Sequence, residues 1–378
     1  MITHDIDNYN ETFFRLWLHN IDGVYNNTYR ILINHFKTAA NVYNADFREL
    51  NNVLCGSDIA LTIYNSKALE YTERLLQKLS SENISILHPL DAEYPDKLLH
   101  ISAPPEILYI KGKLPKSINS SKNNIAIIGS RNPDSYGREY AKSFSYTLAK
   151  QGINIISGLA KGIDSYGHQG ALAAGGCTIA VLGCGINNIY PLQNYKLYEE
   201  IPEKGAIISE YAPNTPPNAY QFPERNRIIS ALSDGILVVE AKKKSGSLIT
   251  CNHALAQGKP IYAIPGRIGD ALSEGTNALI YDGALCTTCP EDIIECLKGE
   301  VTDREELYDK NTAALFSPDE IKIISLLSLD DTYVDTLINR SGLGVTKTIN
   351  TLLTLREKGV IKETAKGYYI RNIMYKSI

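Results

Sequence analysis

Six short apolar runs, separated by longer amphipathic stretches, fill the middle of the chain and constrain its fold more than any other feature. Runs that are apolar at nearly every position are typical of strands covered by helices on both faces. The pattern therefore predicts an α/β fold with a mainly parallel, doubly wound, extended Rossmann-like sheet. The runs occupy residues 125–128, 153–156, 178–182, 206–208, 236–239 and 261–264.

The segments on either side of this predicted Rossmann-like domain, residues 82–298, have different patterns. Upstream, apolar residues recur at helical spacing and predict a bundle of short helices over residues 1–81. Downstream, a charged stretch over residues 299–317 predicts a linker. Residues 318–378 show a pattern of three helices followed by two strands around a tight turn, which predicts a winged helix.

Length and charge limit the classes of function. A chain of 378 residues fits two to three domains of ordinary size. With 38 Lys and Arg against 42 Asp and Glu, the net charge of −4 excludes a chain that is basic throughout but not a local basic groove. No apolar run is long enough to span a bilayer, and the first residues lack the basic and apolar regions of a leader. We therefore expect a cytoplasmic protein with no membrane partner.

The seven cysteines are scattered through apolar or Gly-rich stretches, and their odd number favours reduced thiols over a disulfide framework. Cys286 and Cys289 form a CxxC pair. A zinc site needs further ligands, and only Cys296 follows. A redox site needs the motif at a helix start early in a βαβ unit. We expect structural cysteines and no bound metal.

Ligands of an open parallel sheet bind outside the carboxyl ends of its strands, so the loops there are the candidate sites. The first of these loops, residues 129–137, leads from a predicted strand into a helix. Gly129 lets the backbone approach an anion, the helix start presents amides, and Arg131 adds a bidentate fork. The loop matches neither the dinucleotide nor the Walker motif. The alternative is a tight turn with a surface arginine.

The next two loops repeat this strand-to-helix pattern. In residues 157–164, Lys161 stands close to Gly158 and Gly162, which leave a phosphate room to approach. Asp164 in the same loop is either a helix cap or a ligand. In residues 183–191, Tyr190 either stacks on a base or packs against its own loop.

A fourth loop brings together an aromatic ring, two guanidinium groups and an amide. The side chains of Arg225 and Arg227 diverge by about 200° on a helix, so one of them is expected to face the site while the other pairs with an acid. The residues of this loop are Phe222, Arg225, Asn226 and Arg227.

The fifth loop, residues 242–250, presents Gly246 and Ser247 at a helix start beside three lysines, which are either a solvated run or further phosphate contacts. The loops together offer many phosphate donors but no catalytic set, because the chain has no HExxH, G-x-S-x-G or paired-carboxylate motif. His168 and His253 fall in predicted helices and are expected to be structural. We predict a phosphate-binding protein with no cofactor and no catalytic activity, and the nearby aromatic residues make single-stranded nucleic acid a plausible ligand.

These motifs, in this order and spacing, resemble those of a bacterial family, the DNA-processing protein A (DprA, also called Smf) proteins. The resemblance covers about 200 residues. The matching segments are residues 129–131 with 136–137, 157–164 with His168, 180–185, 209–211, 222–229, 245–250, 265–266, 275–280 and 282–284.

The resemblance implies a protein that binds and protects single-stranded DNA taken up in natural transformation and loads the RecA recombinase onto it. It also implies homodimerisation through the Rossmann-like domain, a sterile-alpha-motif-like N-terminal domain and a winged helix. Arg131 is then the main phosphate contact. The predicted DNA-binding residues are Gly129, Ser130, Arg131, Gly158, Lys161, Gly162, Phe222, Arg225, Asn226, Arg227, Gly246 and Ser247.

Two alternatives accompany this prediction. A Rossmann-like phosphoribohydrolase, which cleaves nucleoside monophosphates, also binds phosphate in Gly-rich loops, but the matching segment here lacks the required carboxylate. A transcriptional regulator would read duplex DNA with Lys347, Arg356 and Lys358 of the winged helix. From residue 311 onward, however, nine Lys and Arg face seven Asp and Glu, so this region is only slightly basic.

Overall fold

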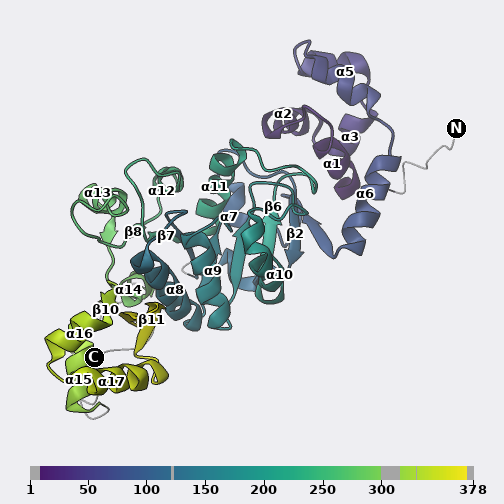
Figure 1. Ribbon diagram of the computed structural model, residues 1–378. Coiled ribbons are helices and arrows are strands. Elements are labelled where there is room, and N and C mark those ends of the chain that lie inside the picture. Colours follow the sequence, from purple (N-terminus) through teal and green to yellow (C-terminus); the bar gives the residue numbers. More distant parts are fainter. Residues whose placement is uncertain (1–8, 121–122, 299–315, 329, 373–378) are drawn as a thin grey trace.

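The computed structural model describes residues 9–120, 123–298, 316–328 and 330–372. A mixed sheet in the strand order β1-β2-β6-β5-β4-β3-β7-β8-β9 forms its centre (Figure 1). The parallel strands begin and end within one residue of the six predicted runs, which confirms the α/β fold class. They are β3 (Asn124–Ile128), β4 (Asn154–Ser157), β5 (Thr178–Val181), β6 (Ala206–Ser209), β7 (Gly235–Val238) and β8 (Ile261–Ala263).

The strand order reverses at β3. Strands β4, β5 and β6 extend the sheet on one side of β3, whereas β7 and β8 extend it on the other. Ile125 of β3 pairs with Ile155 of β4 on one side and with Gly235 of β7 on the other, both in parallel register. The loops after β3 and β7 therefore diverge, and such a reversal is where open α/β sheets form a ligand crevice.

Three further strands were not foreseen from the sequence. β1 (Ile84–Leu87) and β2 (Leu108–Gly112) pair with each other and extend the β6 edge in antiparallel register, while β9 (Leu285–Cys286) lies at the opposite edge. β1 and β9 are short and lie at the two edges of the sheet, and their sequences lack the continuous apolar character of strands buried on both faces. β2 lies between β1 and β6, and its residues 108–110 are apolar and buried like those of the predicted strands.

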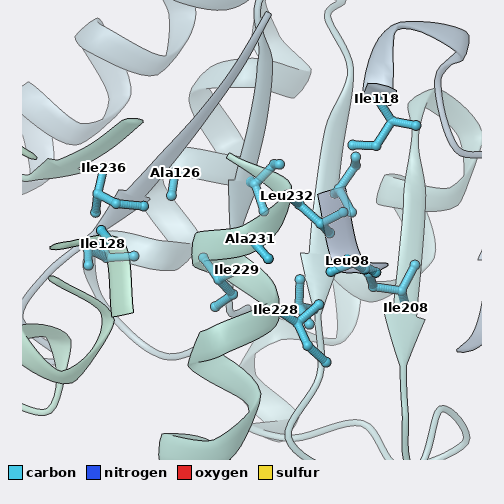
Figure 2. Close-up of a cluster of buried hydrophobic side chains, with 14 of the residues drawn as sticks. Leu98, Ile118, Ala126, Ile128, Ile208, Ile228, Ile229, Ala231, Leu232 and Ile236 are labelled. Atoms are coloured by element: carbon cyan, nitrogen blue, oxygen red, sulfur yellow. The ribbon is translucent and has the colours of Figure 1, made fainter. Parts of the chain in front are cut away.

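Helices cover both faces of the sheet because successive β3 residues point to opposite sides. Ala126 and Ile128 join a core with Ile229 of α11, and Figure 2 shows this helix between the strands and Leu98. Ile125 and its neighbours on the other face pack against α8, α9 and α14. The helices are α7 (Asp96–Leu99), α8 (Ser135–Lys150), α9 (Ile163–Ala173), α10 (Tyr195–Lys204), α11 (Gln221–Leu232), α12 (Ser247–Ala256), α13 (Glu274–Tyr281) and α14 (Pro290–Lys298).

The N-terminal segment is helical, as its apolar spacing predicts. Its helices enclose a core of their own that includes Trp17 and Leu32. Leu75 and Leu79 belong instead to a cluster shared with Tyr109 of the sheet, which anchors the bundle to the β1–β2 edge. The helices are α1 (Glu11–His19), α2 (Asn26–Phe36), α3 (Ala39–Asn44), α4 (Phe47–Val53), α5 (Asp58–Asn65) and α6 (Glu70–Ser81).

The C-terminal segment has the winged-helix order of elements. α15 (Pro318–Leu326), α16 (Val334–Ser341) and α17 (Val345–Glu357) precede the hairpin of β11 (Ile361–Ala365) and β12 (Tyr368–Arg371), and β10 (Thr332–Tyr333) adds a third strand. Of the predicted linker, all but residues 316–317 lies outside the described residues. No helix in the described part of the chain is both long and apolar enough to cross a membrane.

Candidate phosphate-binding cleft

A cleft of about 440 Å³ opens at the reversal point, between the loops that follow β3 and β7 and the first turns of α11 and α12. Eight of the predicted DNA-binding residues line it, whereas Gly158, Lys161, Gly162 and Arg227 do not. The predicted residues that line it are Gly129, Ser130, Arg131, Phe222, Arg225, Asn226, Gly246 and Ser247.

The loop after β3 carries the most accessible cation of the cleft. Gly129 lies so close to the next strand that a Cβ would meet the carbonyl oxygen of Glu240 at 2.7 Å, which excludes larger residues. Arg131 is exposed, and its guanidinium carbon lies 5.7 Å from the centroid of the Phe222 ring. Within the described residues no carboxylate forms an ion pair with Arg131, so its charge faces the cleft and solvent.

The loop after β4, residues 157–164, packs against the loop after β3. Gly162 has a φ of +81°, and a Cβ there would meet the carbonyl oxygen of Ser130 at 2.3 Å. The Ile163 amide donates to that same oxygen at 3.0 Å. Glycine at position 162 thus allows the two loops to pack together, while Lys161 is exposed beside them.

Asp164 and Arg225 are buried together beneath the cleft. The Asp164 carboxylate accepts hydrogen bonds from the amides of Gly158 (3.1 Å) and Ala160 (3.4 Å), so it braces this loop. The helix cap is Gly162, which corrects the alternative that Asp164 caps α9. Arg225 donates to the carbonyl oxygens of Gly158 (2.9 Å) and Val181. Burial raises the pKa of Asp164 above its ordinary value, and the neighbouring charge of Arg225 offsets only part of this increase.

Arg227 is the member of the arginine pair that binds an acid, as the helical spacing predicts. Its guanidinium donates to both carboxylate oxygens of Glu210, at 2.8 and 2.6 Å, in a buried bidentate pair. Asn26 of the N-terminal bundle donates to the same carboxylate at 3.1 Å. The helix that lines the cleft is thereby tied to the N-terminal domain.

The fifth loop adds exposed lysines to the rim. Lys242 and Lys244 line the cleft, and the hydroxyls of Ser245 and Ser247 lie 2.7 Å apart at the start of α12. The lining therefore carries four cations, including Arg131 and Arg225, against the single carboxylate of Asp164. Such a concentration of charge attracts a polyanion.

Glu240 is a functional candidate that no sequence motif indicates, although it lies two residues after the end of the buried strand β7. Its carboxyl group fills the space beside Gly137, at the start of α8, that a Cβ would otherwise occupy. Only 3% of Glu240 is exposed. Burial, followed by the nearby carboxyl of Asp134, raises the pKa of Glu240 to about 8. Its Oε2 has no hydrogen-bond partner among the described residues. The loop that carries Arg131 thus rests on a largely protonated carboxyl.

Other candidate residues have structural surroundings. Tyr136 donates to the carbonyl oxygen of Pro265 at 2.8 Å. His168 is fully buried, its Nδ1 lies 2.7 Å from the hydroxyl of Thr178, and burial lowers its pKa to about 3. The cysteines are free thiols, and the described residues hold no cluster of metal-ligating side chains.

The cations proposed for duplex reading in the winged helix are each paired with an acid. Lys347 contacts Asp319 at 2.7 Å, Arg356 contacts Glu363 at 2.8 Å, and Lys358 contacts Glu320 at 2.6 Å.

The reversal of strand order between β3 and β7, with a cationic cleft at that point, defines an extended Rossmann-like α/β protein. The family model described as DNA recombination-mediator protein A matches residues 85–298. The chain belongs to this family.

Similar proteins agree with this assignment. The chain is 40% identical over 291 residues to the Smf protein of Escherichia coli, covering 75% of this chain and 76% of that one. It is 38% identical over 235 residues to the DNA processing protein DprA of Bacillus subtilis, covering 62% and 77%. The X-ray structure of DprA from Streptococcus pneumoniae matches with a TM-score of 0.64 at 30% identity, over 76% of this chain and 97% of that chain. A structure of DprA from Helicobacter pylori, described for its single-stranded DNA binding mode, matches with a TM-score of 0.52 at 32% identity, over 58% and 98%.

Proposed function

We propose that this protein is a recombination mediator that binds single-stranded DNA through its phosphates in the cleft at the carboxyl ends of β3 and β7. The observation that carries the proposal is the excess of cations in this cleft, with Arg131 exposed and unopposed by a carboxylate within the described chain. The Helicobacter pylori relative, whose reported structure concerns single-stranded DNA binding, supports the choice of ligand.

In this proposal the residues act at two levels. Arg131 and Ser130, which line the cleft, contact a phosphate directly, because a guanidinium fork favours an anion. Lys161 and the lysines of the fifth loop draw the strand in by charge. Arg225 adds positive charge from beneath the cleft, while Arg227 holds the helix in place.

Within the cell, we propose that the protein protects incoming DNA in the cytoplasm during natural transformation and loads the RecA recombinase onto it. We also propose that it acts as a homodimer. The edge of the sheet at β9 supports a contact between copies, since Leu285 of β9 is 45% exposed and Tyr281, at the end of the preceding α13, is 91% exposed. An exposed edge strand and exposed apolar side chains both favour association.

The variant Arg131→Ala tests the DNA-binding proposal. With fluorescent oligo-dT in an anisotropy titration, the variant should bind much more weakly than the wild type. The slope of log K against log salt should become shallower by about 0.7, which is the contribution of one phosphate contact in a single strand. Arg74→Ala is the matched control, because Arg74 is exposed on the distant α6. Unchanged affinity and slope for Arg131→Ala would exclude the proposed site.

A second measurement separates this function from that of a phosphoribohydrolase. Purified protein is incubated with AMP, and free adenine is measured by chromatography. A DNA-binding mediator releases none, whereas catalytic release would contradict the proposal.

A further inference from the structure

The cleft continues outward as a row of three neighbouring groups: a guanidinium over an aromatic ring, and a second ring tilted against the first. The guanidinium of Arg131 lies 5.7 Å from the centroid of the Phe222 ring, and this ring lies 5.5 Å from that of Tyr190 at an interplanar angle of 36°. Arg131 and Phe222 line the cleft, whereas Tyr190 lies beyond its lining residues. The row therefore leads from the proposed phosphate contact to the surface beside the cleft.

The inner ring of this row is fixed in place by its surroundings. Phe222 packs directly on the backbone of Gly183, where a Cβ would approach its ring to 2.7 Å. Tyr190 in contrast is 46% exposed, so the row ends in an aromatic ring that is open to solvent on one side.

The loop that carries Tyr190 is held on both sides before any ligand binds. On one side the amides of Gly185 and Asn187 donate to the carbonyl oxygens of Thr215 (2.8 Å) and Pro213 (2.9 Å). On the other side Asn194 donates to the carbonyl oxygen of Leu159 at 2.8 Å. A ring that is already in position loses little conformational entropy when a ligand stacks on it.

From this geometry we propose that Tyr190 is a base-stacking subsite of the DNA interface. It takes a nucleobase close to the phosphate that Arg131 holds. The proposal rests on the proposed function, since it needs a strand in the cleft. The exposed ring of Tyr190 continues the row of Arg131 and Phe222, and every base has a π-face, so the subsite should accept all four bases. The cleft would supply charge recognition, and Tyr190 would make the protein distinguish a strand with bases from a bare backbone.

The test compares Tyr190→Ala, Tyr190→Phe and Tyr190→Leu in full-length protein, using oligo-dT and an abasic oligonucleotide of the same length. We expect Tyr190→Ala to weaken binding of oligo-dT by about five-fold or more, the usual loss for one stacked base. Binding of the abasic strand should not change. Tyr190→Phe should bind like the wild type because it keeps the ring. Tyr190→Leu keeps apolar packing against Phe222 and should show the loss in a folded protein.

Stacking can also be observed directly. An oligonucleotide with 2-aminopurine should lose fluorescence on binding to the wild type and to Tyr190→Phe, but less on binding to Tyr190→Leu. Tyr71→Ala, at an exposed tyrosine of α6, is the control. Equal losses of affinity for oligo-dT and for the abasic strand, or no loss in Tyr190→Ala and Tyr190→Leu, would overturn the subsite. Failure of the wild type to bind either strand would instead overturn the proposed function.

Discussion

At the scale of single residues, Glu240 is a buried carboxyl next to the cleft, and ionising it costs free energy because burial removes it from water. Its carboxyl is buried against Gly137, and Asp134 lies close by. The folded protein holds a proton on Glu240 up to pH about 8, whereas the unfolded chain releases it near the ordinary value of about 4.3. Between these values the folded state binds more protons, so stability falls as pH rises.

The variant Glu240→Gln should remove this dependence, because the amide is neutral at every pH. We expect its midpoint of thermal unfolding to exceed that of the wild type by more at pH 8 than at pH 5. The difference in unfolding free energy can grow by as much as about 1.4 kcal/mol per pH unit across this window. Glu203→Gln is the control, because Glu203 is exposed on α10. A stability difference that is the same at both pH values would contradict the raised pKa.

The sequence indicated which residues line the cleft better than it indicated which partners hold them in place. The place of Arg131 and Phe222 in one cleft was predictable, because the loops after parallel strands meet at the same edge of the sheet. Helical spacing predicted that one of the two arginines pairs with an acid. It did not identify Glu210 as the partner of Arg227, because Glu210 lies in another loop. The role of Glu240 depends on the missing Cβ of Gly137, which sequence spacing does not relate to it.

At the scale of elements, α17 carries exposed apolar side chains on one side and paired cations elsewhere. Val345, Ile349 and Leu353 are spaced four residues apart and are exposed, so an outer face of the helix carries an apolar stripe. Lys347 and Arg356 are paired with acids of the same domain.

The double variant Lys347→Ala/Arg356→Ala should therefore keep its affinity for single-stranded DNA within about two-fold, because exposed paired charges contribute little. The anisotropy titration used for Arg131→Ala measures it under the same salt conditions. A loss as large as that of Arg131→Ala would place a DNA contact on α17 and contradict this expectation.

The predictability of the strands depends on their place in the sheet. Strands β3 to β8 are buried on both faces, so their sequences are apolar at nearly every position. The edge strands β1 and β9 form because a neighbouring strand offers hydrogen bonds, and their own sequences indicate a strand only weakly. β2 is apolar and buried over residues 107–110, so the same criterion of continuous apolar character applies to it.

At the scale of the whole molecule, the winged helix lies against the Rossmann-like domain, and none of its described residues lines the phosphate-binding cleft. Ion pairs join Lys362 to Glu139 and Arg267 to Asp330 across their contact, which encloses a second cleft of about 680 Å³. The residues that line the phosphate-binding cleft fall between positions 128 and 250.

A fragment that ends at residue 298 should therefore bind oligo-dT within about three-fold of the full-length affinity, since it keeps every proposed phosphate contact. Anisotropy titrations of the two proteins at one salt concentration test this expectation. Complete loss of DNA binding would favour the transcriptional regulator, in which the winged helix is the reader. The proposed domain boundaries would then also need revision.

The hydrogen bonds around Glu210 tie the N-terminal bundle to the Rossmann-like domain, so truncation at the N-terminus should cost more stability than truncation at the C-terminus. Removing the N-terminal bundle takes Asn26 from the Glu210 carboxylate and strips Leu75 and Leu79 from the cluster around Tyr109. A fragment that begins at residue 82 should consequently expose an apolar sheet edge and aggregate during purification. Crystallisation and binding studies of a minimal protein are best served by trimming only the C-terminal side.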